Sequence, residues 1–363
     1  MDPNQPLPRR FSRRKKVVFA AVPLLALLAV GELLARSFRE RHAFAPVTTG
    51  SYRDQRIDLI RRGYPAAHDP LLGYVPRPGF ASAENRWGVM VSIDGDTLRN
   101  NGPKPRPAGP GVLAVGDSFT FGDQVGDADT WPAALERQLR RPVWNGGVFG
   151  YSFAQTVLRA ERLLAALPVA TLVASVIPDD IKRCELSKRF TEVPWFELVD
   201  GELVLKNVPV PDSDRSALDR QWARRLLGHS ALCDTVFWNV APTWWVGDPR
   251  EVVAHPRGRG RAIAAKLLDR LAATCRERHV ALLLVLQDVA EPSAEGREDG
   301  RALIAHANAS AVPWLDLQAE FDLLAATDPG LKQRYFQGHM SAAGNQWVAS
   351  RIAEVLAAPP RGR

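Results

Sequence analysis

The chain has 363 residues, of which 46% are hydrophobic, so it is long enough and apolar enough to bury a substantial core. Its three cysteines are too few for a disulfide framework and lack the spacing of metal ligands, which argues against both of those classes. The net charge of +7 would suit a nucleic-acid binder, but six arginines and lysines cluster in residues 9–16 beside an apolar run, and we expect no nucleic-acid partner.

The N-terminus joins a basic segment, residues 1–16, to the apolar run of residues 17–35. The run is just long enough to cross a bilayer if Glu32, which interrupts it, lies near the headgroups. A basic flank before an apolar run is typical of a signal-anchor whose positive side stays in the cytoplasm. We therefore predict a transmembrane anchor, with most of the chain outside the cytoplasm. A cleaved signal peptide is the alternative, although no Ala-x-Ala site follows the run.

Residues 36–110 are rich in proline, glycine and arginine, and we expect a lead-in region here. Two of its pieces, residues 69–79 and 89–96, have the pattern of short strands broken by turns. The last part, residues 101–110, is typical of a linker.

The region 111–357 alternates between apolar runs and amphipathic segments. Near-continuous apolar strands that alternate with helices indicate an α/β fold with a parallel sheet covered on both faces. The strands are predicted at residues 111–115, 142–144, 170–177, 280–286 and 312–317, and the helices near residues 130–140, 154–167, 262–278, 301–308 and 341–356.

Residues 183–261 break this alternation and predict an insertion over the carboxyl edge of the sheet. Aromatic side chains stack on sugars as readily as they fill cores, so the tryptophans of this insertion have two interpretations. They either shape a carbohydrate cleft or pack in a core or an interface. These tryptophans are Trp195, Trp222, Trp238, Trp244 and Trp245.

Three short blocks carry candidate chemistry. Gly111–Gly122 is predicted as a buried strand followed by Gly-Asp-Ser, which leaves Ser118 at the carboxyl end of the strand, where ligands bind in open α/β sheets. Asn145–Gly150 follows the second strand, and His339 lies within residues 335–345 before the last helix. A serine that simply caps the next helix is the structural alternative for Ser118.

In these three blocks the sequence resembles the SGNH (GDSL-type) esterase and acyltransferase superfamily, over about residues 111–357. The resemblance implies a flavodoxin-like, three-layer SGNH-type α/β fold. It also implies that Ser118 is the nucleophile, that His339 is the base, and that the backbone N–H groups of Ser118 and Gly150 are two arms of the oxyanion hole. Anchored bacterial members carry a similar lead-in, so we expect a single-pass inner-membrane protein with its main domain in the periplasm.

Two positions depart from the family pattern. Asp179 stands where the family places an asparagine that donates to the oxyanion, and an ionised carboxylate only accepts hydrogen bonds. The family also places an aspartate two or three residues before the histidine, where this chain has Gln337 and Phe336. A glutamine carbonyl could orient the ring without supplying a charge. Asp316 or Asp328 could replace the missing carboxylate from another loop.

These observations order the candidate functions. The first is a membrane-anchored ester hydrolase or O-acyltransferase that acts on acyl or acetyl esters of a glycan through a Ser118–His339 dyad. The second is a catalytically impaired protein of the same fold that binds a glycan or takes part in an envelope assembly, and the third is a lipid esterase. We expect no cofactor or metal, because the sequence has neither clustered His/Cys/carboxylate spacing nor a phosphate-binding glycine loop.

Overall fold

The computed structural model divides the chain into two compact units. The smaller unit comprises residues 1–60 and 215–249, and the larger unit comprises residues 61–214 and 250–363. Within them the structure describes residues 12–41, 51–54, 56, 66–83, 88–103, 107–189, 191–211, 222–246 and 251–358.

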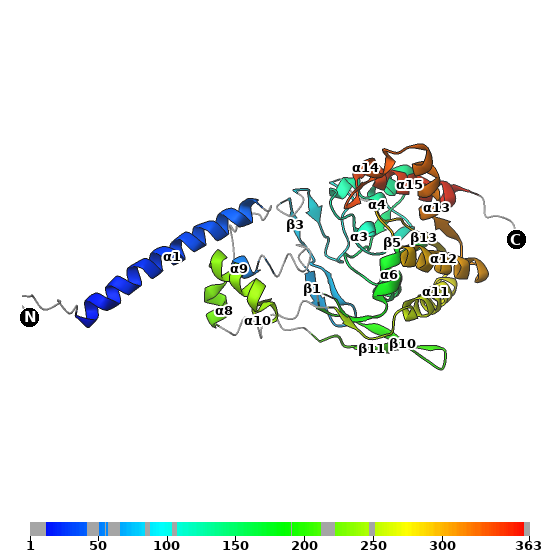
Figure 1. Ribbon diagram of the computed structural model, residues 1–363. Coiled ribbons are helices and arrows are strands. Elements are labelled where there is room, and N and C mark those ends of the chain that lie inside the picture. The colour runs from blue at the N-terminus through cyan, green and yellow to red at the C-terminus, as the bar shows by residue number, and fades with distance from the viewer. Residues whose placement is uncertain are drawn as a thin grey trace, which may run out of the picture. The chain divides into compact units, whose positions relative to one another are not determined.

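A five-stranded parallel sheet forms the centre of the larger unit (Figure 1). Numbered by their order in the chain, its strands lie in the order 2-1-3-4-5, which is the flavodoxin-like arrangement. The fold class expected from the sequence is therefore confirmed. From one edge of the sheet to the other the strands are β6 (Val143–Asn145), β5 (Gly111–Val115), β7 (Val169–Val176), β13 (Ala281–Leu286) and β14 (Trp314–Asp316).

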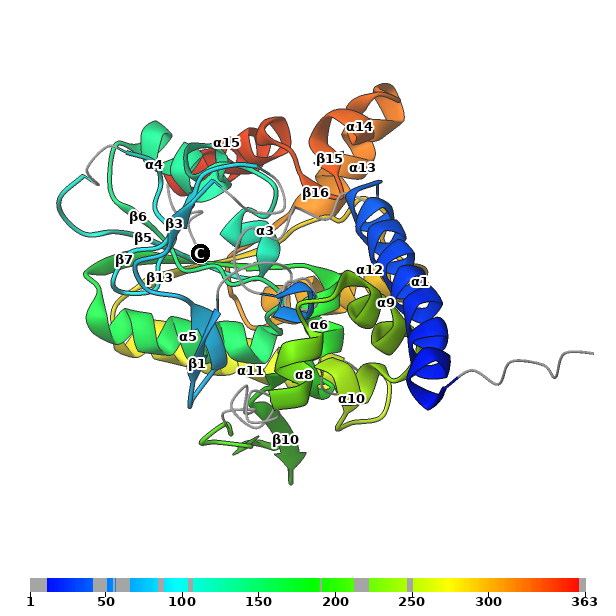
Figure 2. The same cartoon turned by 90° about the vertical axis from the view of Figure 1, so that its left-hand side faces the viewer.

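Helices cover both faces of this sheet and make three layers (Figure 2). Successive residues of a strand point to opposite faces, so β5 sends Leu113 and Val115 into one core and Val112 and Ala114 into the other. The first core is closed by α5 (Phe153–Ala166), α11 (Arg259–Glu277) and α12 (Ala294–Ala309). The second is closed by α4 (Trp131–Leu139), α13 (Leu317–Thr327) and α15 (Ala342–Ala357).

Every strand and helix predicted between residues 111 and 357 is present, with some shifts at the ends. The helix predicted at residues 301–308 begins earlier, because the Ser293 hydroxyl accepts a hydrogen bond from Gly296 N–H and starts α12 at Ala294. The pattern gave no indication of α13, whose first turn is capped by Asp316, or of the short α14 (Leu331–Tyr335).

The lead-in region packs on the sheet domain. Its strands form two antiparallel pairs, β1 (Ala66–Asp69) with β2 (Gly73–Pro76) and β3 (Ala81–Ser82) with β4 (Val91–Ser92). The Tyr74 hydroxyl donates a hydrogen bond of 2.8 Å to the Phe149 carbonyl. The buried apolar residues of the lead-in region belong to the core that α5 and α11 close. They are Leu72, Tyr74, Val75, Val91, Ile93 and Leu98.

The segment expected as one insertion is divided between the two units. Its flanks lie in the larger unit, with an antiparallel hairpin of β10 (Trp195–Val199) and β11 (Glu202–Lys206) and a sheet of β8 (Leu186–Arg189), β9 (Thr191–Glu192) and β12 (Val252–Val253). Its middle belongs to the smaller unit and forms α8 (Trp222–Leu227), α9 (Ala231–Val240) and α10 (Pro242–Val246).

The smaller unit also contains the long helix α1 (Arg13–Arg41). Within the described part of the chain, one helix is long and apolar enough to cross a membrane, and it is the stretch Arg14–Phe38 of α1. Length and composition alone do not distinguish an anchor from a signal sequence.

Candidate active site

The candidate site lies where β5 and β7 end. In the strand order of this fold, the chain leaves β5 for β6 on one side and reaches β7 on the other. The loops after β5 and β7 therefore diverge, and such a switch point is where open α/β sheets bind ligands. The helix α3 (Ser118–Phe121) follows β5, and α6 (Pro178–Arg183) follows β7.

Ser118 is the first residue of α3 and is buried. The residue that caps this helix is its neighbour Asp117, whose Oδ1 accepts a hydrogen bond of 2.9 Å from Phe119 N–H. The cap role considered for Ser118 is thus filled by Asp117. The tight turn needs Gly116, because a Cβ there would lie 2.7 Å from the Ser175 carbonyl oxygen of β7.

His339 reaches Ser118 from the far end of the chain. It begins the short strand β16 (His339–Met340), which pairs with β15 (Phe336–Gln337). Gln124 Oε1 accepts a hydrogen bond of 2.7 Å from the His339 backbone N–H and holds the hairpin in place. The Nε2 atom of His339 lies 3.0 Å from Ser118 Oγ. With its proton on Nδ1, this ring accepts the serine hydroxyl proton, as a general base must.

A buried carboxylate also lies beside the imidazole. Asp123 Oδ2 is 3.7 Å from His339 Nε2, and its side chain is fully buried. The backbone fixes this position, because Asp123 N–H donates to the Ser118 carbonyl oxygen at 3.0 Å. The sequence analysis did not include Asp123, although it lies only five residues after Ser118 and directly follows the block Gly111–Gly122.

The loop that carries Asp123 is held by Arg99, a fully buried residue of the lead-in region. Its guanidinium donates hydrogen bonds to the carbonyl oxygens of Phe121 at 2.8 Å, Gly122 at 2.6 Å and Val125 at 2.6 Å. Three of the five residues from 121 to 125 are thus held by one side chain, and Asp123 lies between them, so the lead-in region helps to build the site.

Arg183 joins three carboxylates at the base of the site. Its Nη1 donates to Asp180 Oδ1 at 2.6 Å and to Asp117 Oδ2 at 3.1 Å, and its Nη2 lies 3.4 Å from Asp179 Oδ2. Burial, followed by the nearby charge of Asp117, raises the pKa of Asp180 well above its ordinary value. Asp117 Oδ2 is also 3.2 Å from Ser118 Oγ, so the hydroxyl has a second acceptor besides the histidine.

An open cavity of about 490 Å³ brings Ser118, His339 and Asp179 together. The Asp179 side chain is 65% exposed, so its carboxylate is available to a bound ligand. The cavity has charged groups of both signs, with Lys182 and Arg183 on one part of its wall and Glu291 on another. Its remaining lining residues are Phe119, Ile177, Pro178, Val289, Ala290, Pro292, Ser293, Gly296 and Gly338.

Two other expected site residues are not among those that line this cavity. Gly150 is buried, and its carbonyl accepts a hydrogen bond of 3.1 Å from Arg189 Nη1. Gln337 is exposed and borders a neighbouring hollow together with Gln124 and Met340.

The two aspartates considered as substitutes for the missing family aspartate have other partners. Asp316 Oδ1 accepts a hydrogen bond of 3.0 Å from Ala319 N–H and caps α13. Asp328 Oδ1 accepts one of 3.1 Å from Gly330 N–H, and its other oxygen pairs with Arg334. The carboxylate that the structure places beside His339 is that of Asp123.

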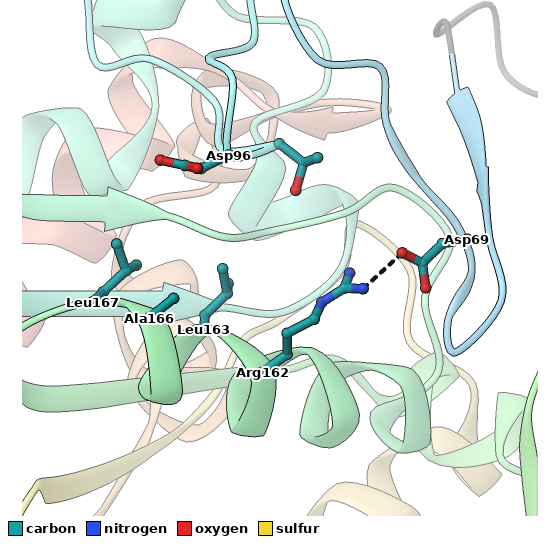
Figure 3. A pocket seen from close by; sticks show the side chains of 7 residues that line it. Asp69, Asp96, Arg162, Leu163, Ala166 and Leu167 are labelled. Atoms are coloured by element: carbon teal, nitrogen blue, oxygen red, sulfur yellow. Dashed lines mark hydrogen bonds and ion pairs between the residues drawn. The ribbon is translucent and has the colours of Figure 1, made fainter.

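A second cavity, of about 280 Å³, lies between the lead-in region and α5 (Figure 3). Arg162 and Asp69 point toward one another across it and form an ion pair of 2.6 Å. Burial raises the pKa of Asp69, but the hydrogen bonds from Arg162, Leu72 and Leu71 outweigh it and hold that pKa below its ordinary value. These contacts tie β1 to α5, and we assign this cavity no catalytic role.

Of the described residues, no group of three or more histidine, cysteine, aspartate or glutamate side chains is placed to hold a metal ion. The three cysteines are free. Burial raises the pKa of the Cys184 thiol to about 12 and that of Cys275 to about 11, so neither is a thiolate at neutral pH.

Comparison with known proteins gives only distant similarities. No family model and no curated protein matches the chain. Among solved structures, the chain is similar to a member of the lipolytic protein G-D-S-L family from Veillonella parvula DSM 2008, with 13% identity and a TM-score of 0.40 over 68% of this chain and 98% of that one. A catalytic mutant of an acetylxylan esterase from Geobacillus stearothermophilus has 13% identity and a TM-score of 0.41 over 71% of this chain and 99% of its own.

A third similar structure is an alpha/beta hydrolase enzyme from the metagenome of Lake Arreo, Spain, with 15% identity and a TM-score of 0.41 over 68% of this chain and 95% of that one. These structures include the G-D-S-L family that the sequence resembles. At these identities and scores, the assignment of chemistry rests on the residues of the site itself.

Proposed function

We propose that this chain is a serine ester hydrolase or O-acyltransferase that works through a Ser118–His339 dyad. The observation that carries the proposal is the distance of 3.0 Å between Ser118 Oγ and His339 Nε2, at the switch point of the sheet and on the wall of an open cavity. Two residues 221 positions apart are brought within hydrogen-bond distance there, which is the geometry that acyl transfer needs.

In the first step His339 takes the hydroxyl proton of Ser118 while Ser118 Oγ attacks the ester carbonyl. The tetrahedral intermediate collapses to an acyl-enzyme, and the imidazolium gives its proton to the departing alcohol. Water or a second alcohol then attacks the acyl-enzyme with His339 as the base. The negative charge of Asp123 stabilises the imidazolium formed in both steps.

We further propose an acylated glycan as the substrate and the bacterial inner membrane as the location. The cavity is open and lined by polar and charged groups, including Asp179, Lys182 and Glu291, which suits a hydroxyl-rich polymer better than a lipid chain. The basic cluster of residues 9–16 before α1 favours an anchor with the larger unit outside the cytoplasm.

The test is hydrolysis of p-nitrophenyl acetate by the full chain in detergent. We expect Ser118→Ala to remove the activity, with Ser350→Ala as the matched control that keeps it, since Ser350 is a half-buried serine of α15 that does not line the cavity. If Ser118→Ala hydrolyses the ester as fast as the unmodified chain, the dyad is not the catalyst. A C-terminal alkaline phosphatase fusion tests the topology and should be active.

A specific observation favours the second candidate, a glycan-binding protein with an impaired site. Asp179 brings a carboxylate to the cavity where a hydrogen-bond donor is expected to stabilise the oxyanion. The two functions separate in one assay, because a binding protein keeps its affinity for acetylated oligosaccharides in Ser118→Ala and releases no acetate in either form.

A further inference from the structure

The interior of the smaller unit holds charged side chains. Asp234 on α9 is fully buried, and its carboxylate accepts hydrogen bonds from Arg56 Nη2 at 2.7 Å and from Trp245 Nε1 at 2.8 Å. Arg53 is buried as well, and its Nε donates to the Trp245 carbonyl at 2.6 Å. Arg224 of α8 donates in the same way to the Trp244 carbonyl at 2.5 Å. Charged groups are rarely buried unless they are paired, and here pairing joins the helices.

The surface of the same unit is apolar. Val240 at the end of α9 is 78% exposed, Trp222 at the start of α8 is 76% exposed, and Leu226 is 66% exposed. Val236 and Trp244 are exposed as well. Single exposed apolar residues are ordinary on soluble proteins, but several within 25 residues are not, and they mark a surface that binds a partner or a membrane.

Glu32 ties these helices to α1. Its carboxylate oxygens accept hydrogen bonds from Ser230 Oγ at 2.7 Å and from the backbone N–H groups of Ala231 and Leu232 at 3.0 Å each. The two helices approach closely here, since a Cβ on Gly31 would lie 3.1 Å from a methyl group of Leu232. The carboxylate that interrupts the apolar run therefore lies at the first turn of α9, where backbone N–H groups without a partner in the helix favour an anion.

The position of Glu32 fixes the level of α9 along α1. The apolar side chains of α1 that precede it are exposed, as at Leu27 with 68%, and they form the stretch suited to the acyl chains. The α9 helix has 10 residues and is about 15 Å long, half of the roughly 30 Å hydrocarbon core, so it cannot cross a bilayer. Since Glu32 lies near the end of the apolar run, its contact holds the first turn of α9 near the level of the headgroups.

We propose that α8, α9 and α10 form a membrane-interface platform that docks on the lipid bilayer in which α1 is anchored. The exposed apolar side chains of α8 and α9 enter the boundary between headgroups and acyl chains, where tryptophan is favoured. The occupant is a lipid surface because α9 is held against α1 at Gly31 and Glu32, and both helices have exposed apolar side chains. This inference rests on the anchoring by α1 proposed above.

Spin labels on the full chain in phosphatidylethanolamine–phosphatidylglycerol vesicles test the proposal. Labels are attached after Val240→Cys on α9, Leu27→Cys on α1 and Val253→Cys on β12, a matched exposed valine of the larger unit. The half-buried Cys233 is replaced by serine in all three, and Cys184 and Cys275 are buried. The readout is the accessibility of each label to oxygen, which concentrates in lipid, relative to a water-soluble nickel chelate.

We expect the oxygen-to-nickel ratio at Val240 and at Leu27 to be several-fold higher than at Val253. If Val240 behaves like Val253 while Leu27 is in lipid, the platform is wrong and the anchor stands. If Leu27 and Val240 are both in water, the anchoring fails together with the platform. If the Val240 label is reached by neither reagent, protein covers α9 and the proposal is overturned.

Discussion

Asp123 Oδ2 lies 3.7 Å from His339 Nε2, so a buried carboxylate accompanies the candidate base without occupying the position that the family pattern gives it. A unit charge at this distance stabilises an imidazolium by up to about 4 kcal/mol at an effective dielectric constant of about 20. We expect Asp123→Asn to lower kcat/KM by about 10- to 100-fold, which corresponds to about 1.4–2.8 kcal/mol. The measurement is ester hydrolysis as a function of pH.

A structural role for Asp123 would not shift the pH profile. Loss of the charge makes protonation of the histidine less favourable, so the acid limb of kcat/KM should move to lower pH in Asp123→Asn. Asp129→Asn, an exposed position in the same loop, is the control and should leave rate and profile unchanged. An Asp123→Asn enzyme with the original profile would contradict the electrostatic role.

Asp179 gives a prediction of increased activity. Its exposed carboxylate borders the cavity where the family has an asparagine donor, and a single oxyanion donor typically contributes ~10²–10³ in rate. We expect Asp179→Asn to raise kcat/KM, up to this factor, because an amide N–H₂ replaces an acceptor-only group. Asp179→Ala removes the charge without adding a donor and should raise the rate less. A loss of turnover in a folded Asp179→Asn protein would show that the carboxylate has a role of its own.

The apolar runs predicted the sheet because β5, β6, β7 and β13 are mostly buried on both faces, which makes each of them a short, nearly continuous apolar segment. The same pattern could not reveal α13, whose start depends on the cap that Asp316 supplies. Ser118 and His339 were found through motifs. Asp123 and Arg99 were not, because their roles arise from contacts with segments distant in sequence, and nothing local distinguishes them from surface residues.

The contact of Glu32 with α9 is a second case in which a role depends on a segment distant in sequence. The sequence showed a carboxylate inside an apolar run and explained it by a place near the headgroups. Only the structure shows that the N-terminus of a helix some 200 residues later meets this charge. The grouping of residues 215–249 with α1 was hidden for the same reason.

Arg183 is predicted to be essential for stability. It donates hydrogen bonds to the buried carboxylates of Asp117 and Asp180, which would be left without this cation in Arg183→Met. Breaking a buried ion pair from one side costs about 3–5 kcal/mol, so the midpoint of thermal unfolding should fall sharply. The double variant Arg183→Met, Asp180→Asn replaces one of the two carboxyl groups that lose this cation and should recover part of the loss. A double variant no more stable than Arg183→Met would contradict this account.

The raised pKa of Asp288, which follows β13, leads to a prediction of how the free energy of unfolding depends on pH. Burial raises its pKa to about 6, against the opposing hydrogen bond from Val289 N–H. The folded state therefore binds more protons than the unfolded state between about pH 4 and pH 6, and stability falls as pH rises through this window. At pH 7 the buried charge costs up to about 3 kcal/mol.

Asp288→Asn keeps an acceptor for Val289 N–H and removes the charge. We expect its midpoint of thermal unfolding to exceed that of the unmodified chain at pH 7 and to match it near pH 4, where the aspartate is already protonated in the folded state. Asp129→Asn, exposed in the same unit, should track the unmodified chain at both values. Equal midpoints for Asp288→Asn and the unmodified chain at pH 7 would mean that the Asp288 carboxylate is solvated and does not oppose folding.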